Sequence, residues 1–131
     1  MTVYRSDPTQ RGFSQPCPLW RGQCTIYTSP HYPHSCRAYT CNLFDEVRVE
    51  KTPLTHAFTV VEQAKALIRE LDAVLPPFST PNFRERLVAF LETPENEAAS
   101  PEIWRKAETL VRFYEAVFGV KDLLEKPDEW Y

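Results

Sequence analysis

All four cysteines of the chain stand close together near its start, and no cysteine follows the last of them; they are Cys17, Cys24, Cys36 and Cys41. Cysteines that served only as small core residues would be scattered along the sequence. Four sulfur atoms in one short segment can instead hold a tetrahedral metal ion, ligate an iron–sulfur cluster or form two disulfides. The clustering therefore predicts a shared chemical role for these four residues.

The spacing of the cysteines leaves the kind of site open. Neither the Cys17–Cys24 pair nor the Cys36–Cys41 pair has the C-x₂-C spacing of common zinc ribbons, and the set does not match the usual ferredoxin runs. The first sixteen residues are polar and contain no apolar core of a secretory signal, so we expect a cytoplasmic protein with reduced thiols. We therefore predict one structural Zn²⁺ on the four cysteines, with an iron–sulfur cluster as the alternative. Two disulfides, or four plain buried thiols, are the remaining interpretations.

The residues around the cysteines resemble a known family. The segments Gly22 to Tyr27 and Pro33 to Cys41 follow the patterns G-x-C-x-I-Y and P-x-x-C-R-x-[FY]-x-C, and the segment Pro16 to Leu19 is similar to a preceding C-P-x-L, with Trp20 at the position of the pattern's leucine. This pattern is similar to the second half of the YkgJ-type zinc/iron-chelating cysteine-cluster proteins, and the resemblance extends over residues 16–75. It implies a metal-binding module. The chain departs from the family in lacking its upstream cysteine cluster and in having Tyr32 where the family has arginine, so it can build at most half of the family's site.

Three histidines add further candidate ligands. His31 and His34 flank the cysteines in a proline-rich loop, where exposure to solvent is the commoner outcome, and His34 is the better candidate because it stands two residues before Cys36. His56 stands at the expected start of a helix, where it more often supports the helix end than binds a metal ion.

The elements that must position these residues are helical. Apolar residues recur at three- and four-residue steps in four stretches, which is typical of amphipathic helices. We expect the helices near residues 37–48, 55–75, 80–92 and 100–118, with a polar connection at 95–99 and a C-terminal cap at Gly119. In the second helix the expected buried stripe is Phe58, Val61, Ala64, Leu67, Ile68, Leu71 and Leu75. The predicted class is mostly α, with an irregular Cys-rich segment at 1–41 packed on three to four helices in 42–131, all in a single domain.

Charge, composition and the absence of known motifs exclude several classes of function. The 131 residues carry a formal net charge of −3 with a sequence pI of about 5.6, and no local basic run offers a surface for nucleic acid. No apolar stretch reaches the length of a membrane span. We find no Ser/His/Asp set, no phosphate-binding glycine loop and no H-E-x-x-H motif, so catalysis by this chain alone is not expected.

Three functional hypotheses remain. The first is a small metal-binding accessory or interaction protein that works with a protein partner. The second is an iron–sulfur protein that transfers electrons or serves a larger redox enzyme. The third is a helical interaction module whose cysteine site is vestigial.

Overall fold

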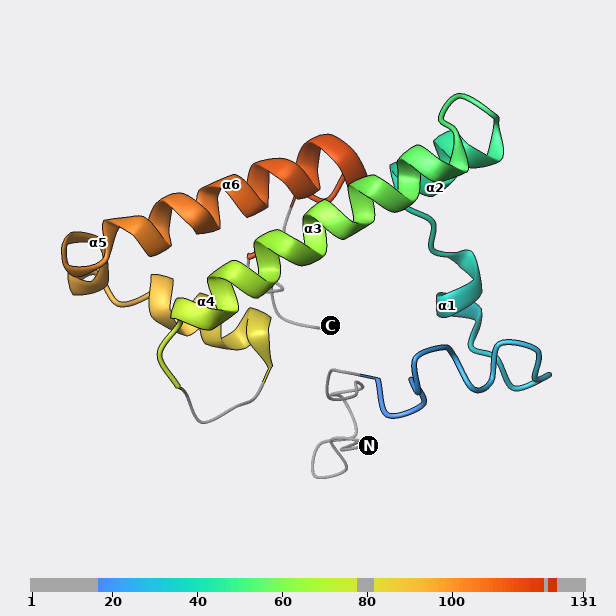
Figure 1. Ribbon diagram of the computed structural model, residues 1–131. Helices are drawn as coiled ribbons and strands as arrows, with labels where there is room; N and C mark the ends of the chain where they lie inside the picture. The colour runs from blue at the N-terminus through green and yellow to red at the C-terminus, as the bar shows by residue number, and fades with distance from the viewer. Residues whose placement is uncertain (1–16, 78–81, 122, 125–131) are drawn as a thin grey trace. The chain divides into compact units, whose positions relative to one another are not determined.

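The computed structural model describes residues 17–77, 82–121 and 123–124 (Figure 1). The chain divides into two compact units, one reaching Tyr39 and the other running from Thr40 to Glu125. Six helices lie in the described residues, and the predicted mostly α class is confirmed. The expected irregular lead over residues 1–16 and the expected helix start at Thr80-Pro81 lie outside the described residues.

The first unit contains one short helix, α1 (His34–Ala38). The second unit contains the other helices of the described chain: α2 (Asn42–Arg48), α3 (Leu54–Val74), α4 (Phe83–Leu91), α5 (Glu95–Ala99) and α6 (Pro101–Phe118). Within this unit α3 packs mainly against α6, and the two long helices run side by side in Figure 1.

The larger hydrophobic cluster joins the end of α3 to α4 and to the first half of α6. Leu71 and Leu87 are fully buried in it, and Leu110 is 1 % exposed. Burying a leucine side chain contributes roughly 1.5–3 kcal/mol. This cluster is therefore the main source of stability for the second unit.

A smaller cluster lies toward the start of α3. Leu43 of α2 is buried there with Ala57 and Val60 of α3, and Phe113 and Val117 of α6 pack against them. The start of α3 thus meets the end of α6, while the end of α3 meets the start of α6, so the two helices are antiparallel.

The bounds of α6 agree with the start and end signals predicted from the sequence. Pro101 is the first residue of α6, and Gly119 caps its end in the left-handed conformation with φ of 72°. A Cβ atom on Gly119 would overlap the side-chain amide of Asn42, the first residue of α2. Glycine is required here both by the backbone conformation and by this close approach.

Other expectations need correction. A single helix over residues 37–48 is wrong, because the extended residues Tyr39 and Cys41 separate α1 from α2. The connection at 95–99 is a short helix, α5. In α3 the first turns bury Ala57 and Val60, whereas Phe58 is 63 % exposed. Small side chains there allow the neighbouring helices to approach closely, which a stripe built on large apolar residues does not anticipate.

Candidate metal centre

Cys17 and Cys24 flank a tight backbone loop. The N–H of Trp20 donates to the Cys17 carbonyl at 3.0 Å, and Trp20 and Cys24 form an isolated antiparallel bridge. The N–H of Thr25 donates to the Leu19 carbonyl at 3.1 Å, and the Thr25 hydroxyl donates to the same oxygen at 2.7 Å. Gly22 turns the loop with φ of 79°, a conformation that favours glycine. Local hydrogen bonds thus fix the backbone between the two thiols.

Cys36 lies in the middle of α1. Pro33 precedes this helix in an extended conformation, as expected for a helix that begins after a proline. Cys36 is exposed, so its thiol is open to solvent. Arg37 follows it in the last turn of the helix.

Tyr32 connects the loop of Cys24 with the helix of Cys36. Its ring meets the ring of Tyr27 edge-on, with centroids 5.4 Å apart, and its hydroxyl donates to the Cys36 carbonyl at 3.3 Å. The Arg37 guanidinium carbon lies 4.8 Å from the centre of the Tyr32 ring.

The surroundings of Tyr32 also raise the pKa of its hydroxyl. It lies above its usual value of 10.0, first because of desolvation and then because the charges of Cys36, Cys24 and Tyr27 oppose an ionised phenol, while Arg37 lowers it.

Cys41 belongs to the second unit, where it is the N-cap residue of α2. Its backbone is extended, with φ of −90° and ψ of 164°, and its carbonyl accepts from the N–H of Asp45 at 3.0 Å. Its side chain makes no capping hydrogen bond. The sulfur of Cys41 is thus not needed to cap the helix.

All four cysteines have free thiols, and none is buried: Cys36 is exposed and the other three are partly exposed. Two of the interpretations left open by the sequence, paired disulfides and plain buried thiols, therefore do not describe this structure. In the part of the chain that the structure describes, no three His, Cys, Asp or Glu side chains stand close enough together to hold a metal ion. The prediction that the four cysteines share one ion is not tested by this finding and stays a prediction.

The segment from Cys17 to Cys41 is positively charged apart from its thiols. It contains Arg21 and Arg37 and no aspartate or glutamate. Four thiolates on a divalent ion carry two net negative charges, which nearby cations stabilise. The donor set and its surroundings thus fit a Zn²⁺ ion or an iron–sulfur cluster by their chemistry.

The histidines lie in or beside the same segment. His34 is the first residue of α1, and both it and His31 are exposed. His56 lies in the first turn of α3, as expected, and is also exposed.

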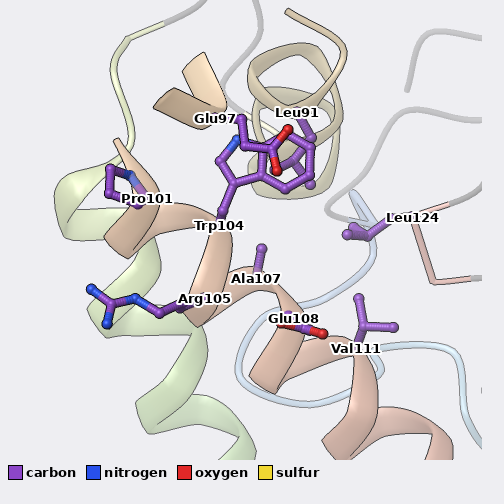
Figure 2. A pocket seen from close by; sticks show the side chains of 9 residues that line it. All are labelled: Leu91, Glu97, Pro101, Trp104, Arg105, Ala107, Glu108, Val111 and Leu124. Atoms are coloured by element: carbon purple, nitrogen blue, oxygen red, sulfur yellow. The ribbon is translucent and has the colours of Figure 1, made fainter. Parts of the chain in front are cut away.

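The second unit contains a separate pocket of about 560 Å³ along α6 (Figure 2). Apolar side chains make up most of its lining, and the Trp104 indole N–H is buried without a hydrogen-bond partner in the described residues. Its charged side chains in the described residues are Glu97, Arg105 and Glu108, and the described lining contains no histidine, cysteine or serine.

We compared the chain with models of known protein families, with curated proteins and with solved structures, and found no match in any of the three comparisons. The resemblance to the YkgJ-type proteins stays a prediction from the motif residues. None of the helices in the described ranges is both long enough and apolar enough to span a membrane.

The sequence analysis named Tyr32 only as the residue that stands where the similar family has arginine, and it did not predict the contacts of Tyr32 with Tyr27, Cys36 and Arg37. Tyr27, Tyr32 and Arg37 recur at five-residue intervals, and Cys36 directly precedes Arg37, but this spacing alone does not specify the contacts.

Proposed function

We propose that this chain is a small metal-binding protein in which Cys17, Cys24, Cys36 and Cys41 hold one Zn²⁺ ion. The ion has a structural role: it orders the segment that carries the cysteines. The protein then acts as an accessory or interaction protein. Because the sequence contains no catalytic motif, this role requires a protein partner.

One observation supports the proposal most strongly. None of residues 17–39 is buried, whereas the second unit contains eleven buried apolar residues. A segment without a core of its own cannot gain much stability from the hydrophobic effect. Structural zinc contributes on the order of 10 kcal/mol in small domains of this kind, which would supply what the segment lacks.

The state of the thiols supports the same proposal. Unpaired cysteine is among the most buried residue types, because it behaves as a small apolar side chain. Here four free cysteines occur together and all retain some exposure. Cys41 packs against the cluster of Leu43, Ala57 and Val60. For Cys17, Cys24 and Cys36, which the two described clusters do not include, ligand chemistry explains the placement better than packing does.

Once bound, a metal ion would supply a cross-link among the four cysteines and would remove the charge of the thiolates from solvent. The residues of the chain contribute the rest. Arg37 places a positive charge beside Cys36, and the hydrogen bonds of the Cys17–Cys24 loop limit the backbone freedom that binding must overcome.

Titration of the reduced, metal-free full chain with Co²⁺ tests the proposal. Cobalt takes the place of zinc and gives visible absorption bands whose position and strength depend on the number of thiolate ligands. We expect saturation at about one Co²⁺ per chain with a spectrum of four-thiolate coordination, and displacement by Zn²⁺. Weaker than millimolar binding, or a spectrum without thiolate ligands, would refute the proposal.

The C36S/C41S double variant provides the control. If the two residues are ligands, it should lose high-affinity binding while its α3 and α6 helices keep their unfolding temperature. An unchanged affinity in this variant would favour the interpretation that the site is vestigial. A brown, iron-containing protein from anaerobic preparation would instead favour the iron–sulfur alternative.

A further inference from the structure

Tyr32 differs from the other aromatic residues described in its unit. Trp20, Tyr27 and Tyr39 are 57 %, 66 % and 67 % exposed, whereas Tyr32 is half-buried. In a segment that buries no residue, a half-buried ring marks the place around which the local structure is organised.

The contacts of Tyr32 reach both halves of the cysteine segment. On one side its ring packs edge-on against Tyr27, which follows Cys24 by three positions. On the other side its hydroxyl donates to the carbonyl of Cys36, and Arg37 covers its ring. The ring therefore connects the backbone that follows Cys24 with the helix that carries Cys36.

The connection between the two halves is also made through the backbone. The N–H of Ser29 donates to the Ile26 carbonyl at 2.9 Å, and the N–H of Tyr32 donates to the Ser29 carbonyl at 3.1 Å. Two successive turns thus return the chain from Tyr27 to Tyr32, where the rings meet.

From this arrangement we propose that Tyr32 is a positioning residue of the metal centre. It holds Cys24 and Cys36 near each other before the ion binds, so that binding costs less conformational entropy. The inference rests on the proposed function, because it assigns a role within the same site. Groups that only orient metal ligands commonly change metal affinity 10- to 100-fold when they are replaced, and we expect a loss of about tenfold here.

Zn²⁺ affinity of the full chain, measured by competition with a chromogenic chelator, tests the role of Tyr32. In Tyr32→Leu both the ring contacts and the hydroxyl are lost, and we expect the affinity to fall about tenfold. In Tyr32→Phe the contacts with Tyr27 and Arg37 remain, and we expect most of the affinity to return. The matched control is Tyr39→Leu, which removes a more exposed tyrosine from the other end of α1 and should leave the affinity unchanged.

Two further readouts separate positioning from general structure. The Co²⁺ spectrum of Tyr32→Leu should keep its four-thiolate form, because no ligand is lost, and thermal unfolding of the helical unit should be unchanged. A fall in affinity in Tyr32→Leu, with an unchanged four-thiolate spectrum and unchanged unfolding of the helical unit, is the result that neither loss of a ligand nor a general loss of structure would produce. If Tyr32→Leu does not fold, Tyr32→Phe still tests the hydroxyl: its affinity should lie below that of the wild-type protein, by less than the tenfold loss expected for the whole side chain, and an affinity equal to that of the wild-type protein would contradict a role for the hydroxyl.

The outcomes also separate this inference from the proposed function. Wild-type protein that binds neither Zn²⁺ nor Co²⁺ would overturn both. Wild-type protein that binds tightly, with Tyr32→Leu and Tyr39→Leu binding equally well, would overturn the role of Tyr32 and leave the metal centre in place.

Discussion

If the four cysteines bind a metal ion as proposed, removal of the ion should release the backbone of residues 17–39 without unfolding the helices of the second unit. The reason is the distribution of buried residues: none lies in 17–39, so the hydrophobic effect gives this segment little protection. Apart from the bonds inside α1, seven backbone N–H groups there donate to backbone carbonyls, and their exchange with deuterated water can be followed. They belong to Trp20, Arg21, Thr25, Ser29, Tyr32, Arg37 and Tyr39.

The size of the effect follows from mass action. At a free Zn²⁺ concentration of about 100 times the dissociation constant, binding adds about 2.7 kcal/mol, so exchange at these groups should slow about 100-fold relative to chelated protein. In residues 17–39 the helical signal comes from the five residues of α1, while α3 and α6 contribute 21 and 18 residues. Circular dichroism should therefore lose less than about a tenth of its helical amplitude on chelation.

The assay is hydrogen–deuterium exchange with and without a strong chelator, read by mass spectrometry of peptides from both units. Peptides of α3 and α6 serve as the internal control and should not respond. The Cys36→Ser variant should exchange rapidly in both conditions. Equal protection of residues 17–39 with and without metal would refute the reasoning, and so would loss of protection across the whole chain.

Three further predictions concern the helical unit. Gly119→Ala should destabilise it by about 1–2 kcal/mol in urea unfolding, because the left-handed backbone and the nearby Asn42 amide both oppose a Cβ atom, and an unchanged midpoint would contradict this. Leu71→Ala should cost about 2–5 kcal/mol by the same assay, whereas Phe58→Ala, at a position 63 % exposed, should be nearly neutral; equal costs would show that the described core is wrong. Burial raises the pKa of Tyr114 above 10.0, so the stability due to this group is complete below pH 10.0 and is lost as the pH rises through its folded-state pKa. In Tyr114→Phe this alkaline loss should be smaller, and an identical pH profile would contradict the assignment.

The sequence predicted most accurately where local chemistry alone decides the structure. Pro101 and Gly119 bound α6 as expected, because a proline tolerates the first turn and a glycine the left-handed cap. The break between α1 and α2 was not predictable in this way, since residues 37–48 contain neither proline nor glycine. Tyr39 and Thr40 are only moderately poor helix formers, and tertiary context decides whether a helix continues through such residues.

Burial and contact across the chain were harder to predict. Periodicity identified the face of α3 that contains Ala64 and Leu71, but it favoured Phe58 over Ala57, because hydrophobicity alone does not reveal where two helices approach closely. The grouping of the four cysteines in the sequence was enough to identify them as candidate metal ligands. The contacts of Tyr32 with Tyr27 and Cys36 could not be predicted from residue types, since they depend on two turns whose direction the residue types do not specify.

The most direct test of the central claim is elemental analysis of protein purified without oxygen and without added metal. If four thiolates share one ion, we expect close to one equivalent of zinc per chain in the wild-type protein. The double variant C36S/C41S should contain no bound zinc. Less than about half an equivalent of any transition metal in the wild-type protein would contradict the claim that these cysteines form a metal centre.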